Sequence, residues 1–191
     1  MGHGAWLEKR TPYLLSLARR LVRHHGIAAA AIDGPEHGER ARTGEAWWTD
    51  AETDAMVADW KATLAACRAR PEIGADVPLG YWGLSMGTIF GLPFVVSEPA
   101  VQVAVLGLMG AVGPTAERLA KAAAELTQPL LFAVQWEDEI APRDKVIELF
   151  GVFATSDKRM IVNPGVHAAV PLETFELTEA FLAKHLASVT H

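Results

Sequence analysis

The run Gly83-Leu84-Ser85-Met86-Gly87 constrains the fold of this chain more than any other feature. It follows an aliphatic and aromatic stretch over residues 77–82 and precedes a second apolar run that starts at residue 88. This order predicts a strand, a sharp turn and then a helix. In such a turn the strained backbone leaves no room for a Cβ atom beside the serine, and the hydroxyl is lifted clear of the sheet. The pattern indicates a nucleophilic serine; the alternative is an ordinary tight turn with an exposed Ser85.

A serine hydroxyl is a poor nucleophile until a neighbouring base, usually a histidine held by a carboxylate, takes its proton. His167 has the most favourable position, because it lies in a loop directly after the strand-like residues 159–163. Open α/β sheets place their chemistry at this end of their strands. The other histidines precede the serine or lie in or after predicted helices: His3, His24, His25, His37, His185 and His191.

The carboxylate that would orient this imidazole is expected in the same kind of position. Residues 129–135 are typical of a buried strand, and Glu137, Asp138 and Glu139 follow it. Three consecutive acids more often form a solvated turn than a site. Their spacing alone does not choose among them.

Predicted strands and helices alternate along the whole chain. Strands are expected over residues 27–32, 77–82, 101–108, 129–135 and 159–163, and helices over 12–25, 51–70, 114–126, 143–153 and 174–186. This alternation predicts one α/β domain, residues 1–191, with a mostly parallel sheet and helices on both faces. The segment between the third and fourth of these strands holds one helix and no large cap, which favours small substrates.

Charge and composition exclude several classes of partner. The formal net charge is −6, and no block of Lys and Arg stands out, so neither nucleic acid nor a membrane surface is an expected partner. The single cysteine, Cys67, excludes a disulfide within the chain. No signal peptide is recognisable at the start, so the cytoplasm is the default expectation.

The sequence predicts neither a metal nor an organic cofactor. His24 and His25 are the only adjacent histidines, and neighbouring residues on a helix are expected to point in different directions. The glycines at positions 2 and 4 lack the later glycine and the preceding strand of a dinucleotide-binding loop.

Five segments together resemble the α/β-hydrolase superfamily, and most of all its dienelactone hydrolase-like serine esterases. Residues 1–5 resemble the family's His-Gly loop, residues 32–40 its Asp-x-Pro-Gly-His-Gly segment, and residues 83–87 its nucleophile turn. Residues 137–142 resemble its acid turn, in which the aspartate lies directly before x-x-x-Pro, and residues 164–167 its Gly-x-His end. The resemblance covers nearly the whole chain.

This resemblance implies a triad of Ser85, Asp138 and His167. It also implies an oxyanion hole formed by the backbone N–H of Met86 and one from the loop at Gly4 and Ala5, with Ala5 as the expected donor. Dienelactone hydrolases use a cysteine nucleophile. The serine in this chain therefore shifts the expected substrate from lactones toward general carboxylic esters.

The chain also departs from the family, because it begins at the His-Gly loop, which follows the third strand in relatives. An N-terminally truncated core is therefore expected, with about five parallel strands. Strands 27–32 and 77–82 are then neighbours, or another chain fills the gap between them. Residues 3–5 are expected to be poorly anchored, and an exposed sheet edge would favour a homodimer.

The function expected from these observations is hydrolysis of small carboxylic esters through an acyl-enzyme. A serine peptidase or an acyltransferase with the same triad is one alternative. A non-catalytic remnant of the fold is the other.

Overall fold

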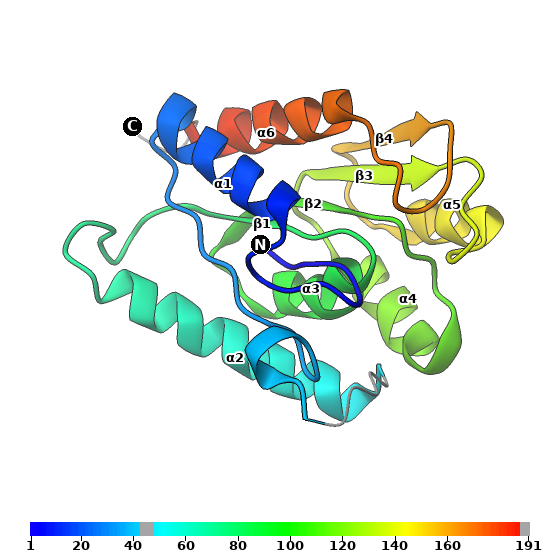
Figure 1. Ribbon diagram of the computed structural model, residues 1–191, viewed down its shortest axis with the longest axis horizontal. Coiled ribbons are helices and arrows are strands. Elements are labelled where there is room, and N and C mark those ends of the chain that lie inside the picture. Colours follow the sequence, from blue (N-terminus) through cyan, green and yellow to red (C-terminus); the bar gives the residue numbers. More distant parts are fainter. Residues whose placement is uncertain (43–47, 188–191) are drawn as a thin grey trace.

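The computed structural model describes residues 1–42 and 48–187. A parallel sheet of four strands in the order β1-β2-β3-β4 lies at its centre (Figure 1). The strands are β1 (Leu79–Trp82), β2 (Val101–Gly107), β3 (Leu130–Gln135) and β4 (Lys158–Asn163). The α/β class predicted from the sequence is confirmed.

Helices cover both faces of this sheet. On one face α1 (Pro12–His25) and α6 (Leu172–Ala187) bury a shared apolar stripe that includes Leu14, Leu17, Phe181 and Leu182. On the other face lie α3 (Met86–Ser97), α4 (Ala116–Glu125) and α5 (Arg143–Val152), with α2 (Asp50–Arg68) packed outside α3. Two 3₁₀ turns, Gly38–Arg40 and Gly113–Thr115, complete the elements.

The ends of two helices follow the local signals in the sequence. Pro12 occupies the first turn of α1, where its missing N–H costs nothing, and Gly26 ends the helix with a left-handed φ of 64°. Thr49 caps α2 through a reciprocal pair of hydrogen bonds with Glu52. None of the described helices combines the length and the apolar character that crossing a membrane requires.

The expected strand over residues 27–32 is wrong. No ladder pairs these residues with β1, and Ala28 and Ala29 are exposed. The first residues of the chain lie between this segment and the sheet. The Met1 amine donates to Ala30 O at 2.7 Å, and Gly2 forms a parallel bridge with Gly83. The sheet of the described residues therefore has four strands, and residues 27–32 do not pair directly with β1.

Candidate active site

Ser85 lies at the turn between β1 and α3, in a strained conformation with φ 58° and ψ −121°. A positive φ is costly for a residue with a side chain and tends to persist at functional sites. The turn is tied to the adjacent strand, because Ser85 N–H donates to Gly107 O at 2.9 Å and Gly83 N–H donates to Val105 O at 2.9 Å. The sheet thus fixes the position from which the hydroxyl projects.

The two glycines of the turn are required by close packing. A Cβ at Gly83 would lie 2.7 Å from Gly87 O, and a Cβ at Gly87 would lie 2.9 Å from Gly2 O. Neither distance is tolerable for real atoms, so the backbone at residues 83–87 approaches both itself and the start of the chain too closely for any side chain. This agrees with the steric argument made from the sequence.

The structure brings Ser85, His167 and Asp138 together from three separate loops. His167 Nε2 lies 2.9 Å from Ser85 Oγ, and His167 Nδ1 lies 2.7 and 2.9 Å from the two carboxylate oxygens of Asp138. Ser85 is intermediate in exposure, whereas the Asp138 and His167 side chains are 1% and 11% exposed. In this chain of hydrogen bonds, Nε2 can accept the serine proton while the carboxylate holds the opposite edge of the ring.

The three consecutive acids have three different partners. Asp138 Oδ1 also accepts the backbone N–H groups of Ile140 and Ala141, at 2.9 and 2.7 Å, which fixes the carboxylate below the imidazole. Glu139 accepts the N–H of His167 at 2.8 Å, and Glu137 accepts the N–H of Gly165. The hydrogen bond from His167 N–H lowers the pKa of Glu139. The two glutamates therefore hold the backbone of the histidine loop, and Asp138 contacts the ring.

The polar side chains that hold the loop at residues 164–167, which carries His167, were not identified from the sequence. Gln135 is buried at the end of β3, and its amide donates to Val166 O at 3.0 Å. Asn163 Nδ2 donates to Gln135 Oε1 at 2.9 Å, and Thr174 Oγ1 donates to Asn163 Oδ1 at 3.1 Å. A polar residue ending a strand of otherwise apolar residues was the available signal for Gln135.

The loop that carries Ala5 is firmly held, so the expectation that residues 3–5 would be poorly anchored is wrong. Gly2 N–H donates to Trp82 O at 2.8 Å, and Gly4 N–H donates to the Tyr13 hydroxyl at 2.9 Å. The buried His3 ring joins two loops, since Nε2 accepts Gly34 N–H at 2.9 Å while Nδ1 lies 2.8 Å from Gly4 O. Hydrogen bonds to Trp82, Tyr13 and Gly34 therefore anchor this loop.

Replacing His3 by glutamine should reduce the pH dependence of stability. Burial lowers the pKa of His3, and this effect exceeds the opposing hydrogen bond to Gly4 O. The unfolded chain takes up a proton near the ordinary histidine value of about 6.5, which the folded state resists. The contribution of this group to the free energy of unfolding is therefore complete above about pH 6.5 and declines as the pH falls below it.

Urea unfolding of the wild type and His3→Gln at several pH values between neutral and mildly acidic would test this prediction. Glutamine retains a donor and an acceptor but does not titrate in this range. The other histidines are present in both proteins. If the free energy of unfolding changed with pH equally in the two proteins, the lowered pKa of His3 would be contradicted.

The backbone N–H groups of Met86 and Ala5 are free to bind another acceptor. Met86 is the first residue of α3, where a helix leaves its N–H unpaired, and Ala5 follows the anchored loop. Among residues 1–42 and 48–187, neither N–H has a hydrogen-bond acceptor. The loop touches the turn, since a Cβ at Gly87 would lie 3.5 Å from His3 O. Both predicted oxyanion donors therefore belong to segments in contact with each other.

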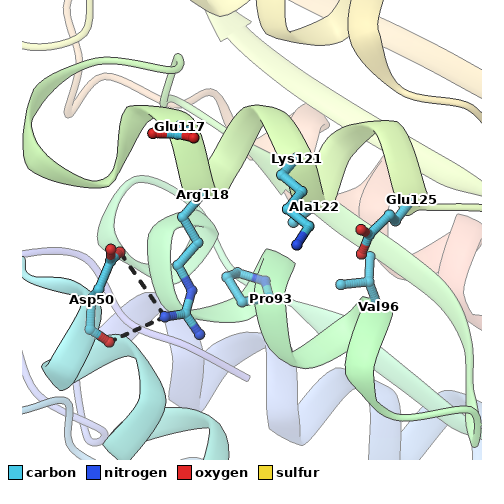
Figure 2. Close-up of a pocket in the computed structure, with 8 residues that line it drawn as sticks. All are labelled: Asp50, Pro93, Val96, Glu117, Arg118, Lys121, Ala122 and Glu125. Carbon is cyan, nitrogen blue, oxygen red and sulfur yellow. Dashed lines mark hydrogen bonds and ion pairs between the residues drawn. The ribbon is translucent and has the colours of Figure 1, made fainter.

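A hollow elsewhere on the surface contains none of the predicted site residues. It lies between the start of α2 and the helices α3 and α4, and Figure 2 shows Arg118 reaching across it toward Asp50. The Arg118 guanidinium is already paired, because Nη2 lies 2.6 Å from Asp54 Oδ1 and Nη1 donates to Asp50 O at 3.2 Å. This hollow is a charged groove stabilised by its own ion pairs.

Comparison with known proteins places the chain among esterases. No protein-family model and no curated protein sequence matches it. One matching structure is the PEG-bound complex of a cold-adapted esterase from an Arctic intertidal metagenomic library, which is 40% identical in sequence. The match covers 97% of this chain and 81% of the esterase chain, with a TM-score of 0.86.

Two more distant structures share the fold alone. The Pyrococcus furiosus esterase Pf2001 is 15% identical, covers 96% of this chain and 81% of its own, and has a TM-score of 0.75. The Paleococcus ferrophilus monoacylglycerol lipase is 15% identical, covers 96% of this chain and 92% of its own, and has a TM-score of 0.72. The identity and coverage of the Arctic enzyme carry the stronger conclusion: this chain belongs to the same family of esterases.

Proposed function

We propose that this protein is a serine carboxylic-ester hydrolase that acts on small esters through a Ser85-His167-Asp138 triad. The observation that carries the proposal is the continuous hydrogen-bonded chain from Ser85 Oγ through both ring nitrogens of His167 to the Asp138 carboxylate. Membership of an esterase family supports the same reaction class.

In the first half of the reaction, His167 Nε2 takes the proton of Ser85 as Oγ attacks the ester carbonyl. The tetrahedral intermediate collapses when the alkoxide leaves with the proton now on His167, and the acyl group remains on Oγ. A water molecule then gives its proton to His167 and attacks the acyl carbon. The carboxylic acid leaves, and the proton returns to Ser85.

The N–H groups of Met86 and Ala5 would stabilise the oxyanion in both halves. They are free, and hydrogen bonds to Trp82, Tyr13 and Gly34 hold the Ala5 loop before substrate binds. Donors fixed in advance are worth about 100- to 1000-fold in rate each. The hydrogen-bonded triad and the anchored loop support a catalytic protein over a non-catalytic remnant of the fold.

The small-ester preference follows from what surrounds the serine. The chain between β2 and β3 holds only a short turn and α4, so this segment places no large cap over the carboxyl ends of the strands (Figure 1). A serine peptidase or acyltransferase would use the same three side chains. Hydrolysis of a short p-nitrophenyl ester, blocked by a serine-directed phosphonate, tests the proposal. No turnover of short-chain esters by folded protein would contradict it.

Activity should rise with pH through one ionisation and then reach a plateau. Only the neutral imidazole of His167 can accept the proton of Ser85, so kcat/KM should be low in acid and increase as the ring loses its proton. The measurement is kcat/KM for a p-nitrophenyl ester from about pH 5 to 9. A flat profile over that range, from protein shown to stay folded throughout, would exclude a histidine base.

A further inference from the structure

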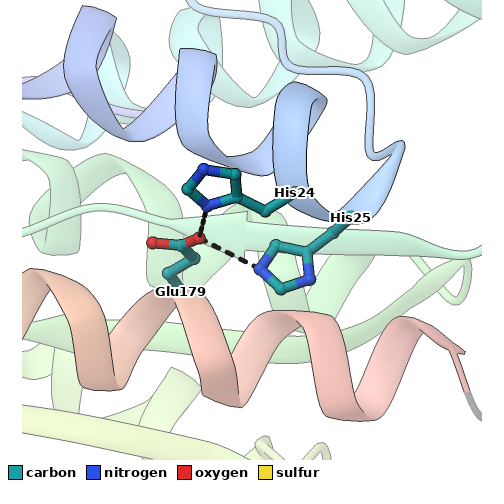
Figure 3. A group of neighbouring side chains, drawn as sticks. All are labelled: His24, His25 and Glu179. Atoms are coloured by element: carbon teal, nitrogen blue, oxygen red, sulfur yellow. Dashed lines mark hydrogen bonds and ion pairs between the residues drawn. The ribbon is translucent and has the colours of Figure 1, made fainter.

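A cluster of His24, His25 and Glu179 joins two helices far from each other in the sequence. Figure 3 shows both imidazoles at the end of α1 directed at the same carboxylate on α6. His24 Nδ1 lies 3.2 Å and His25 Nε2 lies 3.0 Å from Glu179 Oε1. The expectation that the two adjacent rings would point in different directions is therefore wrong. They reach the same oxygen because one uses its Nδ1 atom and the other its Nε2 atom.

We propose that His24, His25 and Glu179 form a binding site for a divalent transition-metal ion such as Zn²⁺. Their three ligand atoms all lie within 4.8 Å of one another. In a tetrahedral zinc site with bonds of about 2.0–2.1 Å, ligand atoms lie about 3.3 Å apart. The two measured nitrogen-to-oxygen distances are close to that separation, so the ligands can surround an ion with small side-chain movements.

The chemistry of the three groups suits such an ion. Two imidazoles and one carboxylate are ligands that zinc prefers, and an open position remains for water. The Glu179 side chain is 4% exposed, whereas His24 and His25 are 53% and 31% exposed. The carboxylate is therefore held inside the protein, while solvent reaches the side of the cluster where the ion would enter.

The Glu179 carboxylate is oriented before any ion arrives. Arg20 Nε contacts the other oxygen, Oε2, and so leaves Oε1 for the two imidazoles. A partner of this kind fixes the direction in which a ligand presents its lone pairs.

Two neighbouring charges act on the ion in opposite senses. The Arg20 guanidinium repels a cation, although Glu176 Oε1 lies 3.9 Å from it and partly offsets its charge. His24 and His25 lie in the last turn of α1, where the carbonyl end of a helix favours positive charge. A bound ion would link α1 to α6, the two helices that cover the same face of the sheet.

The experiment uses the purified protein without an affinity tag, with Zn²⁺ in calorimetry and Co²⁺ in visible absorption. We expect one ion per chain. The visible absorption spectrum should be typical of Co²⁺ with nitrogen and oxygen ligands at a low coordination number. Removing one ligand in His24→Ala, His25→Ala or Glu179→Gln should weaken binding at least about tenfold. The matched control is Glu173→Gln, which removes an exposed carboxylate from the first turn of α6 and should leave affinity unchanged.

Stability gives a second measurement that does not depend on ester hydrolysis. Zn²⁺ at about 100 times its Kd should raise the Tm of the wild type by roughly 5–10 °C and that of His24→Ala by much less. His24 is exposed, so this variant should fold even if Glu179→Gln does not. No stoichiometric binding to the wild type, or equal affinity in the wild type and His24→Ala, would overturn the proposal and show that the cluster is only an ion pair.

Discussion

Ser85→Ala should abolish ester hydrolysis and leave the fold intact, with kcat lower by at least about 1000-fold. Alanine retains the backbone of the turn but removes the Oγ atom that lies 2.9 Å from His167 Nε2. Ser85 carries no hydrogen bond that the core requires, because its N–H still donates to Gly107 O in the variant. The measurement is p-nitrophenyl ester hydrolysis beside a melting curve for each protein.

The matched control for this variant is Ser97→Ala. Ser97 lies at the other end of α3, where its hydroxyl donates to Phe94 O at 3.1 Å, so its loss should leave turnover near that of the wild type. A Ser85→Ala protein that retained more than a few per cent of activity would show that Ser85 is not the nucleophile.

Asp138→Asn should lower kcat by about 10⁴-fold, because an amide in place of the carboxylate favours the wrong imidazole tautomer. Asp138 is the only one of the three consecutive acids that contacts the His167 ring in the described part of the chain. Glu137 and Glu139 accept backbone N–H groups instead, and a glutamine oxygen can still accept them.

Glu137→Gln and Glu139→Gln therefore serve as controls for Asp138→Asn. Each loses a charge on the same loop, and we expect each to retain activity within about tenfold of the wild type. Similar losses in all three variants would mean that charge at this loop matters and the identity of the residue does not. A larger loss in Glu137→Gln would reassign the orienting carboxylate.

The sequence by itself determined the class of fold, and local patterns in it predicted Ser85 as the nucleophile and His167 as its base. The requirement for glycine at position 83 is local, because a Cβ there would lie 2.7 Å from Gly87 O within the same turn, whereas Gly87 is required by contact with Gly2. The alternation of strands and helices along the chain can also be recognised locally, and it predicts a parallel sheet. His167 was selected because it follows a strand, and strand ends meet at one edge of a parallel sheet.

Only the tertiary structure decided which acid faces the imidazole on physical grounds. Glu137, Asp138 and Glu139 are equivalent in spacing, and the path of the loop after β3 separates them into one ring contact and two backbone contacts. The resemblance to known hydrolases had indicated Asp138, but spacing and charge in the sequence left the three open.

The remaining differences between the sequence-based predictions and the structure arise where segments far apart in the sequence pair with each other. Residues 27–32 have the composition of a strand, yet a strand needs a neighbour, and the start of the chain lies between them and β1. His24 and His25 converge on Glu179 because α1 packs beside α6, more than 150 residues later in the chain. Local sequence determines turns, helix ends and the periodicity of apolar residues. Contacts between residues far apart in the sequence depend on how whole helices and strands pack, and no local pattern relates those elements to each other.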